Sequence, residues 1–274
     1  MQNQKKSLEI SCYVLGAGAF GVFLRWLQDQ MAFDEAGLAE KSVFHFIVPL
    51  FILASAYVFI RFVDNFRAKR FFLPEDFSGA LRNDGKSYAF FRWAIGVLMC
   101  LGAILVFLTC EVEKYPGMLR VIAVLGILTG ISYPLLLSAA NQKNIHPSFL
   151  CVLSIIPVVL FSFWLIACYK MNDINSVVWS FGIEIIAIII TILAFFRMAG
   201  FAFGTPKSGH CMFYAMMGCT MCVMTVADTR NIGLQIMFFA AALMLLFYNW
   251  IMVKNLVQRK AQREEPLEDG FDRL

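Results

Sequence analysis

Residues 177–196 read VVWSFGIEIIAIIITILAFF, and Glu184 is the only charged residue in this run of twenty. A helix rises about 1.5 Å per residue, so twenty residues cover about 30 Å, which is the thickness of the hydrocarbon core of a bilayer. The segment is therefore predicted to be a transmembrane helix.

Seven further stretches of the chain have the same apolar character. The composition requires an apolar environment, because 60% of the 274 residues are hydrophobic, only 15% are charged, and the mean hydropathy is +0.71. A soluble domain needs more polar side chains than this to cover its surface. We predict an all-α fold, a polytopic transmembrane helix bundle of about eight spans: Ile10–Leu27, Val43–Ile60, Trp93–Cys110, Met118–Ala140, Phe149–Cys168, Val177–Phe196, Cys211–Ala227 and Ile232–Val253. The seventh is the weakest, because it is short and contains Gly218 and Thr220.

The distribution of basic residues predicts the orientation of the chain. With the N-terminus in the cytoplasm, an even number of spans returns the C-terminus to the same side. Only six of the 23 Lys and Arg residues then lie outside, namely Arg25, Lys41, Lys114, Arg120, Lys170 and Arg230. The other 17 lie inside, as the positive-inside rule requires. Both termini are expected to be cytoplasmic, and the membrane is expected to be the bacterial cytoplasmic membrane.

The chain is predicted to form one transmembrane domain over residues 1–258. Halves of four spans each, 1–142 and 143–258, are one way to divide it, because each half starts and ends inside. The charged tail 259–274 is expected to be disordered. The longest loop, between residues 62 and 91, is basic and aromatic and carries a turn or helix start at Pro74–Asp76. Its basic residues are expected to meet anionic inner-leaflet lipids or a partner protein: Arg67, Lys69 and Arg70.

Glu184 is the first candidate site residue, because an ionised carboxylate within a span costs about 2–3 kcal/mol unless it is paired or protonated. Its expected depth matches that of three basic residues on other helices: Arg25, His45 and Arg120. Such a group can be an outward-facing binding site for a solute, an ion or a proton. It can equally be a structural ion pair that holds helices together.

The seventh span is rich in soft sulfur ligands. Cys211, Cys219 and Cys222 lie along one helical stripe, and Met221 lies on another. Thiolates and thioethers suit Cu(I), and a Cys-x-x-Cys pair can exchange disulfides. Cysteine and methionine are also ordinary packing residues of an apolar bundle. Packing is the favoured interpretation, so no metal site and no cofactor is predicted.

No motif in the chain indicates an enzyme. Gly16-Ala-Gly18-Ala-Phe-Gly21 matches G-x-G-x-x-G, but it lies within an apolar span and is interpreted as a small-residue packing face. The net charge of +4 comes from residues that flank spans, so no nucleic-acid partner is expected. The leading hypothesis is a permease, or a permease-like subunit, for a small solute or ion. The alternatives are a non-transporting membrane scaffold or accessory subunit and an intramembrane thiol-disulfide oxidoreductase.

Overall fold

The computed structural model describes residues 2–32, 42–69, 71–142, 146–172, 178–228 and 230–258, and these ranges are almost entirely helical. Eight helices in this part of the chain are long and apolar enough to cross a membrane, which confirms the predicted all-α, eight-span fold. They are α1 (Gln2–Met31), α2 (Phe44–Ala68), α4 (Lys86–Thr109), α5 (Pro116–Ala139), α6 (Pro147–Met171), α7 (Val178–Ala202), α8 (Ser208–Met224) and α9 (Ile232–Lys254).

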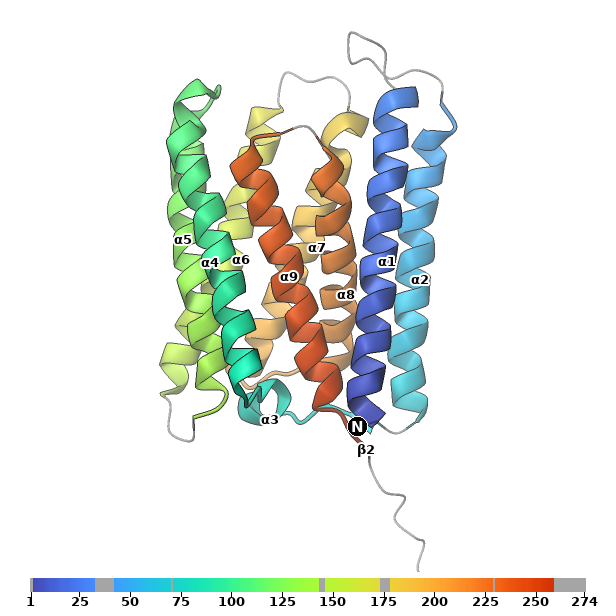
Figure 1. The fold of residues 1–274 in the computed structure, drawn as a ribbon, viewed down its shortest axis with the longest axis vertical. Coiled ribbons are helices and arrows are strands. Elements are labelled where there is room, and N and C mark those ends of the chain that lie inside the picture. Colours follow the sequence, from blue (N-terminus) through green and yellow to red (C-terminus); the bar gives the residue numbers. More distant parts are fainter. Residues whose placement is uncertain are drawn as a thin grey trace, which may run out of the picture.

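Both ends of the described chain lie at the same end of the bundle (Figure 1), which we call the lower end. The upper end is where α1 finishes and α9 begins. An even number of crossings requires this arrangement, and the orientation of the bundle in a membrane stays a prediction.

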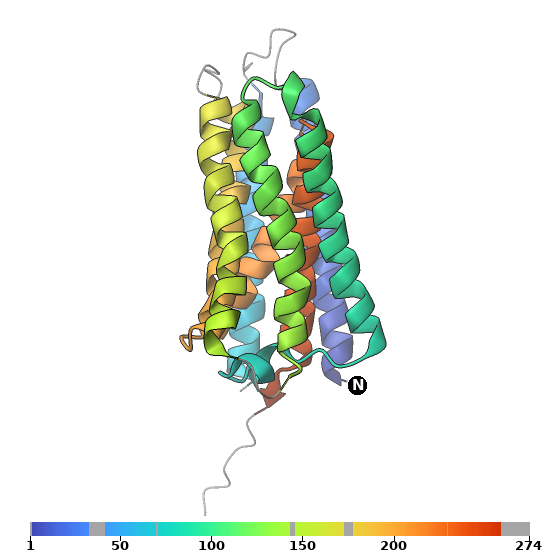
Figure 2. The same cartoon turned by 90° about the vertical axis from the view of Figure 1, so that its left-hand side faces the viewer.

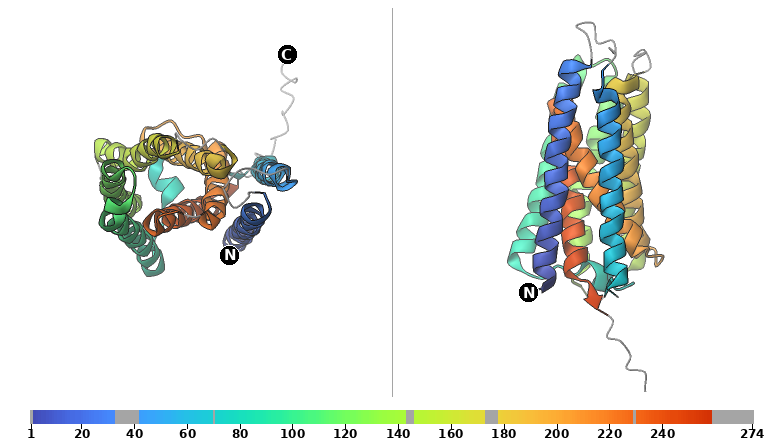
Figure 3. Two further views of the ribbon diagram at one scale, coloured as in Figure 1. Left: turned by 90° about the horizontal axis from the view of Figure 1, so that it is seen from above. Right: turned by 90° about the vertical axis from the view of Figure 1, so that its right-hand side faces the viewer.

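Helices α4 to α9 form a closed ring in which each helix packs against its neighbours in sequence and α9 returns to α4. Figure 3 shows this ring from above, with α1 and α2 outside it. Helix α1 packs on α8 and α9, and α2 packs mainly on α1 and α8. Contacts of α4 with α9, of α5 with α6 and of α1 with α8 join the two predicted halves, and the division of the chain into halves stays a prediction.

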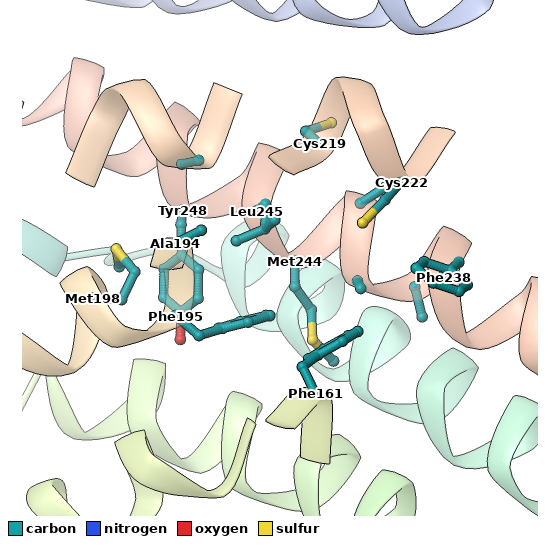
Figure 4. Packing of buried hydrophobic residues seen from close by; sticks show 14 of the residues in the cluster. Phe161, Ala194, Phe195, Met198, Cys219, Cys222, Phe238, Met244, Leu245 and Tyr248 are labelled. Carbon is teal, nitrogen blue, oxygen red and sulfur yellow. The ribbon is translucent and has the colours of Figure 1, made fainter. Parts of the chain in front are cut away.

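Aromatic side chains from four helices pack against one another inside the ring, and we call this set the aromatic stack. It runs from Phe238 through Trp164, at 4.5 Å between ring centroids, to Phe161 at 5.6 Å from Trp164. It continues through Phe195 and Tyr248 to Tyr133 on α5. Figure 4 shows part of this packing. All six side chains are buried, so they fill the ring between its upper and lower ends.

The predicted seventh span corresponds to α8, which crosses with only 17 helical residues before a 3₁₀ turn, η2 (Thr225–Ala227). Buried residues make up 67% of its apolar window, against 22% for α2. Helix α8 therefore faces protein rather than lipid. This explains why Gly218 and Thr220 are tolerated: the nearest atoms to a Cβ on Gly218 would be those of Leu245 at 2.7 Å.

The predicted long loop is shorter than expected, because α2 continues to Ala68 and α4 begins at Lys86. Between them, β1 (Phe71–Phe72) pairs antiparallel with β2 (Val257–Gln258), and α3 (Phe77–Leu81) follows. The predicted helix start is confirmed, since Asp76 caps α3 by accepting a hydrogen bond of 2.7 Å from the backbone N–H of Gly79. Two-residue strands carry no sequence periodicity, so this pairing was not predicted.

Helix α3 lies across the lower end of the ring, where Figure 3 shows it inside the ring outline. Asn255 holds it there by donating to the backbone oxygens of Ala80 and Arg82 at 3.0 and 2.9 Å. Asn83 follows α3 and donates to the backbone oxygen of Leu137 at 2.9 Å. Since Ala80 and Leu81 are completely buried, this segment closes the ring from below.

Candidate functional site

A group of polar and charged side chains lies at the upper end, between α1, α2, α7 and the segment that joins α8 to α9. We call it the upper charge network, and it consists of Arg25, Gln28, His45, Glu184, Asp228 and Arg230. The fold brings these residues close together because α1 ends, and α2, α7 and α9 begin, at this end of the bundle (Figure 1).

Asp228 is the centre of the network because its two carboxylate oxygens bind different arginines. Oδ1 accepts from Nε of Arg25 at 2.6 Å, and Oδ2 accepts from Nη2 of Arg230 at 2.6 Å. Asp228 directly follows the 3₁₀ turn η2, and Gln235 donates to its backbone oxygen at 2.8 Å. The carboxylate is therefore held rigidly between the two guanidinium groups.

Arg25 joins the network to α2. Its Nη1 donates to Oε1 of Gln28 at 2.7 Å, and Nε2 of Gln28 lies 3.3 Å from Nδ1 of His45. Asp29 adds a weaker ion pair, with its Oδ1 3.8 Å from Nη2 of Arg25. Only 2% of the Arg25 side chain is exposed, so its charge depends on these partners rather than on water.

Arg230 is the least satisfied member of the network. Nη2 donates to Asp228 and to the backbone oxygen of Thr225, and the guanidinium lies 4.7 Å from the centroid of the Phe238 ring. Nη1 forms an ion pair with Oε1 of Glu184 at 3.1 Å, and within the described part of the chain neither Nη1 nor Nε has a partner in hydrogen-bond geometry. Only 8% of this side chain is exposed. Arg230 thus presents buried N–H donors beside Glu184, directly above the aromatic stack.

Three of the four residues predicted for this site lie close together in the structure. Glu184, Arg25 and His45 belong to the network, although Glu184 pairs with Arg230 rather than directly with Arg25. Arg120 lies elsewhere: it pairs with Glu111 near the start of α5, and both side chains are more than half exposed. An exposed cation at a helix end needs no intramembrane partner.

Sequence reasoning missed Asp228, Arg230 and Gln28 as members of the site. The expected partners of Glu184 were residues at the same depth inside spans, whereas Asp228 and Arg230 belong to the short connection before α9. A useful signal was present, because two opposite charges two residues apart follow an apolar span at the predicted outer end. Such a connection can fold back over the helix ends and bring its charges to a carboxylate one or two turns below.

The sulfur-rich residues of α8 are packed in the interior. Cys211, Cys219, Met221 and Cys222 are each at most 1% exposed, and the Sγ of Cys222 lies 3.1 Å from Oγ1 of Thr191. Figure 4 shows Cys219 and Cys222 among apolar neighbours. Within the described residues, no three His, Cys, Asp or Glu side chains gather as a metal site requires. Thiol exchange needs access for a partner thiol, so this burial disfavours a redox role.

The predicted basic surface lies at the lower end. Lys69 is exposed there, whereas Arg70 and the side chain of Arg67 lie outside the described part of the chain.

Comparisons of the chain with protein-family models, with curated proteins and with solved structures give no match.

Proposed function

We propose that this integral membrane protein is a permease, or a permease-like subunit, that binds a small solute at the upper charge network. The observation that carries the proposal is the buried ion pair of Arg230 with Glu184, in which the Nε donor of Arg230 has no hydrogen-bond partner among the described residues.

The energetic cost of the network supports a functional role. Two guanidinium groups and the carboxylates of Glu184 and Asp228 are at most 16% exposed, close to the ends of apolar helices. Buried ion pairs often contribute little net stability compared with apolar side chains of the same volume. Charged groups inside membrane proteins are accordingly associated with substrate, ion or proton sites.

The chemistry of Arg230 defines the kind of solute. Its N–H donors favour a group with anionic or strongly accepting oxygens, such as a carboxylate, which binds guanidinium through short, charge-assisted hydrogen bonds. Glu184 lies at 3.1 Å from the same guanidinium and would have to move or become protonated when such a group binds. The site thus fits a small solute bearing a carboxylate or a similar oxyanion.

The aromatic stack below the network fits the same function. It separates Arg230 from the lower end of the ring, and α3 adds a second closure there. A permease needs such barriers on one side of its binding site, so that the site does not open to both sides at once. The membrane is expected to be the bacterial cytoplasmic membrane, with the network on the outer side.

One observation favours the accessory-subunit alternative. Arg25 is bound by Asp228, Gln28 and Asp29, as expected of a network that only holds helices together. On that alternative, neutralising Arg67, Lys69 and Arg70 would disrupt a complex with a partner, and Glu184→Gln would have no effect on activity.

The test is a thermal-stability screen of the detergent-purified protein with small carboxylates, amino acids, other oxyanions, sugars, nucleosides and inorganic ions. A solute that binds only the folded protein stabilises it by about 2.7 kcal/mol at a hundredfold excess over Kd. We expect a carboxylate or oxyanion to raise Tm in the wild type, and the same solute to be taken up by proteoliposomes.

Matched variants separate the site from general effects. Glu184→Gln and Arg230→Gln should lose most of the solute-dependent rise in Tm, whereas Arg120→Gln should keep it, because Arg120 belongs to an exposed pair at the same end. Unchanged binding and uptake in both network variants would contradict the proposal. A screen without any stabilising solute would favour the accessory subunit.

A further inference from the structure

A groove of about 480 Å³ lies on the outer surface between α4 and α9, near the lower end. Its lining is aromatic and aliphatic apart from Ser87, and consists of Ser87, Tyr88, Phe91, Ile95, Leu243, Leu246, Phe247 and Trp250. The rings of Tyr88 and Phe91 lie 6.1 and 6.5 Å from that of Phe247. Phe91 is 54% exposed and Ile95 is buried, so the groove has an open rim and a closed floor.

The groove exists because α4 and α9 meet closely at one end only. Near the upper end, the two helices touch through glycines: a Cβ on Gly233 would lie 2.6 Å from the backbone nitrogen of Val106 and 2.8 Å from the backbone oxygen of Gly102. Towards the lower end the helices diverge (Figures 1 and 2). Bulky rings line the space that opens, and they do not close it.

A cation lies at the lower end of the groove. Nζ of Lys254, the last residue of α9, is 4.1 Å from the centroid of the Tyr88 ring. Lys86, the first residue of α4, is exposed one position before Ser87. Asp84, the nearby carboxylate in sequence, is bound by Arg82 at 2.5 Å. Among the described residues, the groove therefore has lysines at its end, while its length is apolar.

We propose that the α4–α9 groove binds an anionic phospholipid, with an acyl chain along the apolar lining and the phosphate beside Lys254. Charge and shape agree with this occupant. Ser87 and Ile95 are eight residues apart on α4, so the lining extends about 12 Å from the bundle end into the apolar zone. An apolar protein helix would leave Lys254 without an anion, and a soluble phosphate would leave the apolar lining uncovered.

The site also agrees with the predicted orientation, because the lower end carries the termini that are expected to be cytoplasmic. Anionic lipids are concentrated in the cytoplasmic leaflet, and one Lys near that surface is worth about a fivefold gain in lipid affinity. The inference does not depend on the solute site, which lies at the opposite end of the bundle.

Trp250 makes a direct test possible, because it lines the groove and bromine atoms on an acyl chain quench tryptophan on contact. The wild-type protein is reconstituted in phosphatidylcholine vesicles that contain a minor fraction of either brominated phosphatidylglycerol or brominated phosphatidylcholine. Subtracting the signal of Trp250→Phe isolates the groove from the other tryptophans. We expect brominated phosphatidylglycerol to quench Trp250 with about fivefold higher apparent affinity than brominated phosphatidylcholine.

Charge variants identify the phosphate contact. Lys254→Gln should abolish the preference for phosphatidylglycerol, and Lys254→Arg should keep it. Lys170→Gln should also keep it, because Lys170 lies in the last turn of α6 at the upper end. Soluble glycerol phosphate should not displace the lipid, since it has no chain to bind the lining. Equal quenching by the two lipids in the wild type, an unchanged preference in Lys254→Gln, or displacement by glycerol phosphate would each overturn the proposal.

Discussion

Asp228 is the residue on which the upper charge network depends, because it is shared by both arginines. Arg25 and Arg230 come from segments separated by about two hundred positions, and the two oxygens of one carboxylate connect them. Removing that charge takes a 2.6 Å ion pair from each guanidinium group and leaves Arg25 with Asp29 and Arg230 with Glu184. Glu184 contacts Arg230 at Nη1 and makes neither of the two bonds that Asp228 makes.

Asp228→Asn is therefore expected to destabilise the protein by about 3–5 kcal/mol, the range found when one partner of a buried ion pair is removed. The measurement is thermal or denaturant unfolding in detergent. Glu111→Gln is the matched control: it breaks the pair with Arg120, in which both side chains are more than half exposed, and should cost at most about 1 kcal/mol. Equal losses of stability in the two variants would show that the network stabilises the protein no more than an exposed ion pair does.

At the scale of the helices, the contact between α4 and α9 determines how the ring closes. The last helix of the chain returns to the first helix of the ring through glycines, whose lack of a side chain lets the two backbones approach. Small residues are a common means of association in lipid, where apolar side chains gain little by leaving acyl chains for protein. The same contact produces the divergence that opens the lipid groove below it.

Gly233→Ala should separate α4 from α9, since its Cβ would lie 2.6 Å from a backbone atom that cannot move independently. We expect a loss of about 1–3 kcal/mol, as for other overpacked interiors. Gly16→Ala on α1 is the control, because a Cβ there meets nothing within 4 Å. That variant should be neutral or should gain up to about 1 kcal/mol from helix propensity. Unfolding of both purified variants under the same conditions distinguishes these opposite signs.

At the scale of the whole molecule, the two sites lie at opposite ends of one bundle. The network lies where α1 ends, and the groove with its lysine lies where α9 ends (Figure 1). The excess of basic residues on the side of the termini predicts which end faces the cytoplasm. This orientation would present the network to external solutes and the groove to the anionic leaflet.

Reporter fusions in a bacterial host test the orientation. Alkaline phosphatase, which is active only after export, should be inactive when fused after Leu274, and a fluorescent protein fused there should fluoresce. Phosphatase fused after Asn172, which follows α6 at the upper end, should be active. The opposite pattern would place the network in the cytoplasm and would exclude an outward-facing site.

The sequence by itself was enough to predict the class of fold and the number of spans. Hydrophobicity is a property of each segment alone, and about twenty apolar residues such as 177–196 have to cross a bilayer wherever the neighbouring helices lie. Glu184 could be singled out in the same way, because the cost of a carboxylate in an apolar run depends on its immediate surroundings.

Only the tertiary structure decided which side chains meet. Lipid gives helices no strong hydrophobic reason to associate, so their arrangement follows from contacts between distant segments, such as Gly102 with Gly233. The ring of α4 to α9, the burial of α8 and the meeting of Arg25 with Asp228 all arise from such contacts. Arg25 and Arg120 are both basic residues within predicted spans. Packing buries Arg25 beside Asp228 and leaves Arg120 exposed beside Glu111.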